Sequence, residues 1–323
     1  MPDDHQSLRI AVLDDYQGLA HDLADWSSLA GAEVVAFHDH VSDDRELAAR
    51  LAPFDILVLI RERTPLGADL IAALPRLKLV VTIGLWNAAI DVAACAARGI
   101  PVCGTAGGDP DATPALAWGL VLGVTRGIAR QAASVAAGGW QIGLGTDVKG
   151  KTLGILGLGK IGRRVAEFGH VFGMRCIAWS QNLKAEDAAA VGVERVDKDR
   201  LFRDADVLTI HLKLGDRTRG LVGVRELGLM KRSAYLVNTS RGPIVDEAAL
   251  IDAIRTGRLA GAGLDVFDTE PLPPAHPFRT MPSVLATPHI GYVSRATYEA
   301  AFPQIVEDIA AWMRGTPLRV LEG

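Results

Sequence analysis

The chain has 323 residues, 49% of them hydrophobic, which is enough for two domains with buried cores. Its net charge is −4 with both signs interspersed, so it lacks the basic stripe of a nucleic-acid-binding protein. It also lacks the roughly 20-residue apolar stretch of a membrane span and the apolar leader of a secreted protein. The three cysteines have no metal-binding or redox spacing. We therefore expect a cytoplasmic protein with reduced thiols and without metal, nucleic-acid or membrane partners.

The first third of the chain alternates strand-like and helix-like segments. Helices are predicted at 42–51, where Ser42 is the expected N-cap, and at 88–98. The apolar run at 55–60 is continuous, which is typical of a parallel strand buried on both faces. This alternation predicts an α/β domain with a parallel sheet. Its predicted strands are 8–13, 33–37, 55–60, 77–81 and 100–103.

Residues 104–114 break the pattern with glycine, proline and aspartate, which indicates a loop or hinge. Pro114 suits the first turn of a long helix, which we expect to run to about Ala136. A second α/β part extends to about residue 288, and a final helix is predicted at 295–314. The strands predicted in this second part are 152–156, 175–179, 207–210, 235–238, 261–265 and 284–286.

The motif Gly-Leu-Gly-Lys-Ile-Gly lies near the midpoint of the chain, between a predicted strand and a predicted helix. Gly157 would permit the tight turn, Gly159 the approach of a pyrophosphate, and Gly162 close packing of the helix on its strand. The backbone N–H groups of Lys160 and Ile161 would face the phosphates at the positive end of the helix. The motif predicts a dinucleotide site, so we expect the preceding half of the chain to bind substrate.

The end of the next strand decides between NAD and NADP. An acidic residue there grips the ribose 2′-hydroxyl in NAD enzymes. This chain has Ser180, Gln181 and Asn182 instead, all able to donate hydrogen bonds, and Lys184 is the nearest cation. Ser180 and Gln181 are therefore predicted cofactor-binding residues, and we expect either NAD or NADP to bind.

Three charged residues each follow a predicted strand in the second half of the chain. Arg241 can hold a substrate carboxylate and polarise a carbonyl. His289 can donate a proton as hydride arrives at that carbonyl, and Glu270 can orient the imidazole and favour its protonated form. Since parallel strands end at one edge of a sheet, we expect the three side chains to lie at the same edge. An arginine, a carboxylate and a histidine at that place predict hydride transfer to a 2-keto acid.

With these motifs the chain resembles the D-isomer-specific 2-hydroxyacid dehydrogenase family over nearly its whole length. The matching segments are the glycine motif, Asn-Thr-Ser-Arg-Gly at 238–242, Asp-Val-Phe-Asp-Thr-Glu-Pro-Leu at 265–272, and Thr-Pro-His-Ile-Gly at 287–291. The resemblance implies two Rossmann-like, doubly wound parallel-sheet domains with a cleft between them. It implies a flavodoxin-like substrate-binding domain from residues 1–103 plus 289–323, and an inserted NAD(P)-binding domain at 104–288.

The resemblance also implies roles for particular residues. Arg241, Glu270 and His289 would be catalytic, and Asp265 would contact the nicotinamide amide. The backbone of Ile83, Gly84 and Leu85 would hold the substrate carboxylate. The family further implies a homodimer built through the cofactor domain and the long helix after Pro114.

Three departures from the family pattern leave the substrate open. Trp86 replaces a glycine beside the expected substrate loop, Ala115 replaces a common glutamate, and Lys213 replaces a usual proline. The leading prediction is an NAD(P)-dependent enzyme that interconverts a 2-keto acid and its D-2-hydroxy acid. A phosphoglycerate dehydrogenase is a weaker alternative, since no basic cluster for a phosphate is evident. A dinucleotide-sensing, corepressor-like binding protein is the alternative from another class.

Overall fold

A computed structural model of the protein describes residues 7–322, which form two compact units. Unit 2 is the internal segment Pro110–Val293, and unit 1 consists of the chain on either side of it. The N-terminal residues 1–5, where the sequence predicts no apolar leader, lie outside the described residues. The units divide after 109 and 293, whereas the sequence predicts divisions after 103 and 288. Residues 289–293 belong to unit 2 because Asp265 binds the backbone N–H groups of Ile290 and Gly291.

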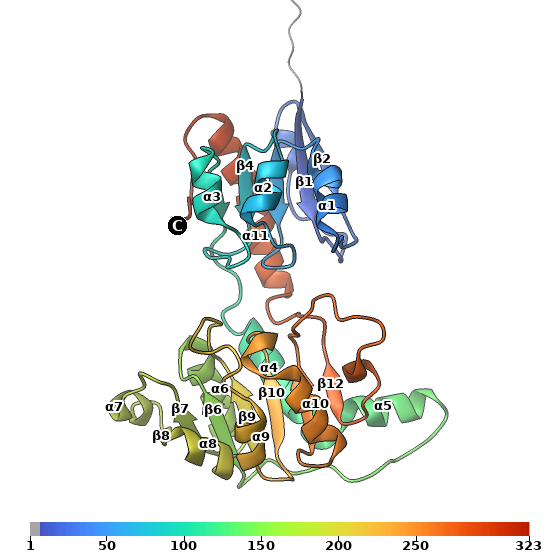
Figure 1. Ribbon diagram of the computed structural model, residues 1–323, viewed down its shortest axis with the longest axis vertical. Coiled ribbons are helices and arrows are strands. Elements are labelled where there is room, and N and C mark those ends of the chain that lie inside the picture. The colour runs from blue at the N-terminus through green and yellow to red at the C-terminus, as the bar shows by residue number, and fades with distance from the viewer. Residues whose placement is uncertain (1–6, 323) are drawn as a thin grey trace, which may run out of the picture. The chain divides into compact units, whose positions relative to one another are not determined.

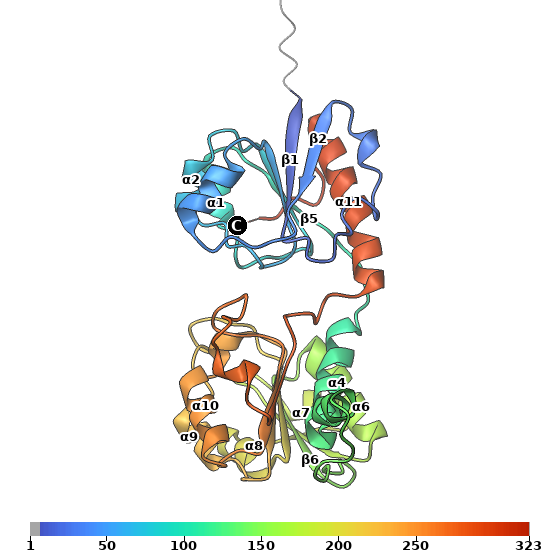
Figure 2. The same ribbon diagram turned by 90° about the vertical axis from the view of Figure 1, so that its right-hand side faces the viewer.

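Within the described residues, unit 1 contains a five-stranded parallel sheet of order β2-β1-β3-β4-β5. This is the flavodoxin-like order that the resemblance implies. Helices cover both faces, with α1 and α2 opposite α11 (Figure 2). The strands are β1 (Leu8–Leu13), β2 (Ala32–Ala36), β3 (Ile56–Leu59), β4 (Leu79–Thr82) and β5 (Val102–Gly104). The helices are η1 (Trp26–Ser28), α1 (Asp44–Leu51), α2 (Ala68–Ala73), α3 (Val92–Ala97) and α11 (Arg295–Met313).

Two helices of unit 1 begin later than the sequence predicts. The N-cap of α1 is Asp43 rather than Ser42, and its carboxylate accepts hydrogen bonds from Arg45 N at 3.0 Å and Glu46 N at 2.9 Å. A carboxylate also interacts favourably with the positive helix end. The helix predicted from residue 88 starts only after Asp91, whose side chain accepts a 2.8 Å hydrogen bond from Ala94 N.

Unit 2 contains, among its described residues, a seven-stranded parallel sheet of order β12-β11-β10-β9-β6-β7-β8. The strand order reverses between β6 and β9, which makes their carboxyl ends a topological switch point where dinucleotides bind. The two-residue strand β8 is not predicted because it is too short to show a pattern. The strands are β6 (Thr152–Leu156), β7 (Arg175–Trp179), β8 (Glu194–Arg195), β9 (Val207–Ile210), β10 (Tyr235–Asn238), β11 (Gly261–Leu264) and β12 (Val284–Ala286).

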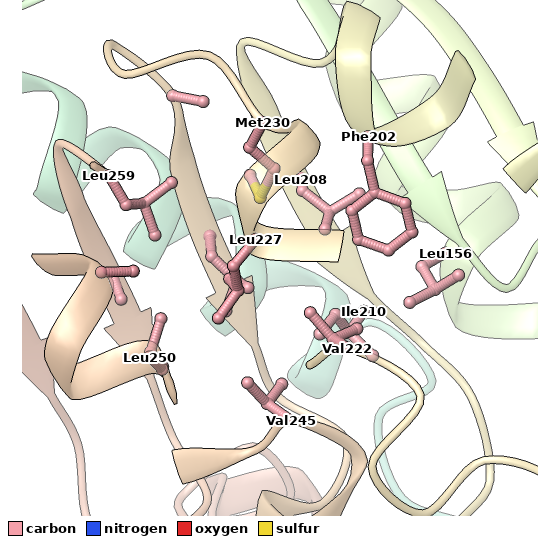
Figure 3. Close-up of a cluster of buried hydrophobic side chains, with 14 of the residues drawn as sticks. Leu156, Phe202, Leu208, Ile210, Val222, Leu227, Met230, Val245, Leu250 and Leu259 are labelled. Carbon is pink, nitrogen blue, oxygen red and sulfur yellow. The ribbon is translucent and has the colours of Figure 1, made fainter. Parts of the chain in front are cut away.

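Both faces of this sheet are buried, as the apolar strands predict. Leu156, Leu208 and Ile210 point to one face and pack with Phe202 and Leu227 in the cluster of Figure 3. Alternate residues such as Ile155 and Val207 point to the other face. Helices α8 (Lys198–Asp204), α9 (Val224–Leu229) and α10 (Glu247–Arg255) cover the first face, and α4 (Ala112–Arg126), α6 (Lys160–Val171) and α7 (Ala185–Ala189) cover the second (Figure 2). The short helices η2 (Gly242–Ile244) and η3 (Pro277–Arg279) follow β10 and precede β12.

The long helix predicted from Pro114 to about Ala136 is broken. Helix α4 ends at Arg126, and α5 (Ile128–Ala136) follows after a 66° bend at Gly127, which has a φ of +60°. Glycine adopts this left-handed conformation without steric cost and so ends the helix. Every residue of α5 is at least partly exposed, and the helix projects from the body of unit 2 (Figure 1). Among the described residues no single helix could span a membrane, and only the bent α4–α5 pair together has the length and composition.

The C-terminal tail completes unit 1. Val320 bridges Cys103 at the edge of β5, and Gly104 N donates a 3.0 Å hydrogen bond to Arg319 O. The Arg319 guanidinium also binds Asp308 of α11, at 2.8 Å. Asp308 is fully buried, and this burial raises the pKa of its carboxyl to about 6 against the opposing effect of Arg319.

This raised pKa predicts a pH-dependent stability. Between about pH 4 and 6 the folded protein binds a proton at Asp308 that the unfolded chain releases, so the free energy of unfolding falls as pH rises through this window. We expect Asp308→Asn to flatten this dependence. Urea unfolding at a series of pH values measures it, with the exposed Asp187→Asn as control. Equal slopes for wild type and both variants would contradict the prediction.

Candidate functional site

The predicted glycine turn joins β6 to α6 at the switch point, and its glycines have distinct structural roles. Gly157 has a φ of +104°, and a Cβ there would lie 2.7 Å from His211 O. A Cβ on Gly162 would collide with the carbonyl oxygen of Gly157. The space beside Gly159, in contrast, is open. Gly157 and Gly162 are therefore required by the fold itself, whereas Gly159 leaves room for a ligand.

Helix α6 begins directly after this turn. Gly159 is its N-cap and provides no side chain to accept hydrogen bonds from the first-turn N–H groups, which include those of Lys160 and Ile161. Such groups, at the positive end of a helix, bind phosphate. Beside the turn, Thr209 Oγ1 lies 2.8 Å from His211 Nε2, and burial lowers the pKa of His211 to about 3. This histidine is therefore neutral near pH 7 and adds no charge to the phosphate-binding end.

The segment after β7 holds the residues expected to face the cofactor ribose. Ser180 is partly buried and Gln181 is exposed. Leu183 N donates to Ser180 O at 3.1 Å, and the Arg195 guanidinium donates to Leu183 O at 2.8 Å. Arg195 comes from β8, where it pairs with Ala178 of β7. The sequence prediction misses this cation because only the strand pairing brings it to the segment.

The three predicted catalytic residues follow adjacent strands of the sheet: Arg241 follows β10, Glu270 follows β11 and His289 follows β12. Glu270 Oε2 lies 2.6 Å from His289 Nδ1, and Glu270 Oε1 accepts a 2.9 Å hydrogen bond from Phe267 N. Both carboxylate oxygens are thus fixed. With Nδ1 in the bond to Glu270, proton exchange between His289 and a ligand would use Nε2.

The turn that carries His289 is held by Asp265. His289 has a φ of +52°, which is uncommon for a residue with a side chain. The buried Asp265 accepts hydrogen bonds from Thr287 Oγ1 at 2.6 Å, Ile290 N at 2.8 Å and Gly291 N at 2.9 Å. Burial raises the pKa of Asp265, and these hydrogen bonds oppose that rise. In this structure both Asp265 oxygens therefore bind the His289 turn.

The Arg241 segment is held by its neighbours. Asn238 Nδ2 donates to Arg241 O at 2.9 Å, and Asn238 Oδ1 accepts from Ser240 N at 3.0 Å. A Cβ on Gly242 would collide with the backbone of Phe267. This close approach places the segment after β10 directly against the segment that carries Glu270.

The predicted substrate loop follows β4 in unit 1. Ile83 is buried, Gly84 has a φ of +96°, and Leu85 is exposed. Gly84 N donates a 3.1 Å hydrogen bond to Thr105 Oγ1. The Arg61 guanidinium covers Gly84 and donates to Ile83 O at 3.3 Å. The sequence prediction misses Arg61, which reaches the loop because β3 is the neighbour of β4.

Residues 7–322 contain no group of three or more His, Cys, Asp or Glu side chains that could hold a metal ion.

Comparison with known proteins identifies relatives over most of the chain. The model of a family described as "D-isomer specific 2-hydroxyacid dehydrogenase, NAD binding domain" matches residues 118–291. A glyoxylate reductase from Aeropyrum pernix is 40% identical over 259 residues, which cover 77% of this chain and 77% of that protein. A D-3-phosphoglycerate dehydrogenase from Archaeoglobus fulgidus is 35% identical over 85% of this chain, but only 53% of that longer protein is matched. The crystal structure of a phosphoglycerate oxidoreductase from Vibrio cholerae has a TM-score of 0.90 at 41% identity, covering 96% of this chain and all of that one.

The glycine turn generates a paired prediction. Gly162→Ala should lower the free energy of unfolding by about 1–3 kcal/mol, because its Cβ meets backbone. Gly159→Ala should cost no more than about 1 kcal/mol, the cost of replacing an N-cap glycine, but weaken NADH or NADPH binding by about tenfold, since its Cβ enters the open space. Denaturation without cofactor and fluorescence titration with each cofactor measure the two effects. Unchanged cofactor binding by Gly159→Ala would remove Gly159 from the cofactor site.

Proposed function

The chain belongs to the D-isomer specific 2-hydroxyacid dehydrogenase family, and we propose that it reduces a short 2-keto acid to the D-2-hydroxy acid at Arg241, Glu270 and His289. As a member of this family it is an oxidoreductase that uses a nicotinamide dinucleotide. The observation that carries the proposal is the 2.6 Å contact between Glu270 and His289. A carboxylate fixed against an imidazole at the end of neighbouring strands is suited to proton transfer.

Glu270 holds Nδ1 of His289, which leaves Nε2 to carry the proton that is transferred. His289 then donates its Nε2 proton to the carbonyl oxygen of the keto acid, and the oxygen becomes the hydroxyl of the product. The reduced nicotinamide, when bound, supplies the hydride to the carbonyl carbon. In the reverse reaction the neutral His289 accepts the hydroxyl proton, so the same pair serves both directions.

Arg241 binds the substrate carboxylate in this proposal. A guanidinium presents two parallel N–H groups that match a carboxylate and also polarise the adjacent carbonyl. In unit 1, the Ile83–Leu85 backbone is proposed to bind substrate, so we assign unit 1 as the substrate-binding domain. Unit 2 is the cofactor-binding domain, with phosphates at Gly159, Lys160 and Ile161.

The ribose end of the cofactor site suits both NAD and NADP. Ser180 and Gln181 stand where a carboxylate would repel a 2′-phosphate, and Arg195 adds a guanidinium close to this segment. Each can donate hydrogen bonds to phosphate or hydroxyl oxygens. Asp265 contributes through the His289 turn that it holds, and contact with the nicotinamide amide is the further role we assign to it.

A second candidate substrate class is a keto acid that carries an additional anionic group, such as a phosphate. The Arg61 guanidinium beside Gly84 favours it, because a fixed cation at the substrate loop attracts a second negative charge. Arg61 also contacts Glu62, with 3.4 Å between Nε and Oε2, so part of its charge is balanced within the protein. For this reason the short, singly charged keto acid remains the primary proposal.

We also propose that the protein is a cytoplasmic homodimer that pairs through α5. An exposed helix of nine residues is marginal in water by itself, and α5 presents Ile128 and Val135 at 54% and 56% exposure. The groove along it is lined by Ile128, Ala132, Val135 and Ala136, together with Arg126 and Gln131. Trp140, 74% exposed, extends the apolar surface. A second copy of the chain offers the same surface and would cover both the groove along α5 and Trp140.

The activity is tested by the loss of reduced-nicotinamide absorbance with NADH and NADPH separately, against glyoxylate, hydroxypyruvate, pyruvate, phenylpyruvate and 3-phosphohydroxypyruvate. We expect turnover with at least one short keto acid, and a decrease in kcat of about 10²–10⁴-fold in His289→Ala with little change in cofactor binding. A fully active His289→Ala variant would overturn the proposed mechanism. A preference for 3-phosphohydroxypyruvate would favour the second candidate.

The dimer is tested by sedimentation of wild type and a Val135→Asp variant. We expect a dimer for wild type and a monomer for the variant, because a charge placed on the apolar face must be desolvated on pairing. Val171→Asp, at a position that is 82% exposed on α6, is the matched control and should remain dimeric. A monomeric wild type, or dissociation of both variants, would contradict the assignment of α5.

A further inference from the structure

A second histidine–glutamate pair, His276 and Glu247, contacts the segment that carries Glu270. The segment leaves β11, contains Glu270 near its middle and returns to the body of unit 2 at η3. Glu247, the first residue of α10, faces both ends of it. Glu247 Oε1 lies 2.9 Å from His276 Nε2, and Glu247 Oε2 accepts a 3.4 Å hydrogen bond from Asp268 N. One carboxylate therefore ties the beginning and the end of the segment to α10.

The hydrogen bonds of His276 define its tautomer. His276 Nδ1 accepts a 3.2 Å hydrogen bond from Phe278 N, so the proton of the neutral ring is on Nε2. That proton is directed to Glu247. The two ends are also packed: Phe267 and Phe278 are buried in one hydrophobic cluster with ring centroids 6.3 Å apart. The His276 ring lies 4.9 Å from that of Phe278.

Electrostatic repulsion acts against this arrangement. Burial raises the pKa of Asp268, and the neighbouring charges of Glu247 and Asp246 raise it further. Three carboxylates thus crowd the start of α10, and Arg219 and His276 oppose the rise. Without the His276 hydrogen bond, repulsion would favour movement of the segment away from α10.

Such a movement of the segment would displace the Glu270 carboxylate. Phe267 N, adjacent to Asp268, donates the hydrogen bond that fixes Glu270 Oε1, while Glu270 Oε2 contacts His289 at 2.6 Å. A shift of the Phe267–Asp268 backbone therefore changes the position of the carboxylate relative to the imidazole. Displacements of about 1 Å in a reacting geometry can lower rates about 100-fold.

We propose that Glu247 and His276 are positioning residues for the Glu270–His289 pair: they clamp the segment at both ends so that Glu270 reaches His289. This inference rests on the proposed function, since it assigns the clamp a purpose through the acid–base pair. Neither residue contacts the keto acid or the reacting atoms in the proposed mechanism.

Steady-state kinetics of four variants test the clamp. Glu247→Ala and His276→Ala should lower kcat by about 10- to 100-fold, with KM for the cofactor within about twofold of wild type. His276→Gln retains a donor toward Glu247 and should recover most of the lost kcat, and Glu247→Gln should lie between wild type and Glu247→Ala. The conservative variants keep the test informative if an alanine variant does not fold. Glu226→Ala, which removes the 2.9 Å pair with Lys198 elsewhere in unit 2, is the control and should keep its kcat.

A double-mutant cycle separates positioning from general stabilisation. In the Glu270→Gln background, Glu247→Ala should lower kcat by less than about twofold further. Additive effects, or a lower melting temperature with unchanged kcat, would overturn the clamp. Full activity of Glu270→Gln and His289→Ala would contradict the proposed function. Full activity of the Glu247 and His276 variants, with Glu270→Gln and His289→Ala impaired, would contradict the clamp alone.

Discussion

The strands of unit 2 all run in one direction, and the candidate site depends on this constraint. In a parallel sheet every strand delivers its following residue to the same edge. Arg241, Glu270 and His289 are separated in sequence by whole strand–helix units, yet they follow adjacent strands. The same edge carries the glycine turn at the switch point between β6 and β9. An antiparallel sheet of the same residues would have sent alternate members to opposite ends.

Parallel pairing sets the edge, and buried carboxylates set the positions of the individual groups along it. Asp265 accepts hydrogen bonds from two backbone N–H groups and one hydroxyl, and these hold the left-handed turn at His289. Burying a carboxylate is costly, and burial raises the pKa of Asp265. Its bonds to the His289 turn offset part of that cost. Two carboxylates from the segment after β11 therefore position the imidazole: Asp265 holds its turn, and Glu270 contacts Nδ1.

Most of the architecture could be predicted from the sequence because buried parallel strands are continuous apolar runs. β6, β7, β9, β10 and β12 begin and end where the apolar pattern indicates. Helix boundaries were harder, since they depend on single side chains and backbone angles. Asp43 rather than Ser42 caps α1, and the left-handed Gly127 divides a stretch whose composition favours one long helix.

The types of residue in the candidate site were also predictable, whereas their supports were not. The glycine motif and the arginine, glutamate and histidine after successive strands are local signals. Arg195, Arg61 and Glu247 become neighbours of the site only through strand pairing or loop packing, which no local spacing reveals. Likewise, the sequence indicated Gly157, Gly159 and Gly162 together, but only the structure separates the glycines that the fold requires from the one that leaves open space.

The tail that pairs with β5 has a consequence for how the chain is made. Unit 2 is one uninterrupted stretch, so all its contacts are available as soon as that stretch has left the ribosome. Unit 1 is completed later, because α11 and the Val320 bridge to Cys103 come from residues that are synthesised after unit 2. Its N-terminal strands therefore spend the synthesis of unit 2 with one sheet face uncovered. Long-range closure of this kind is slow, and it makes the nascent first unit, rather than the inserted one, the part of the molecule most in need of a chaperone.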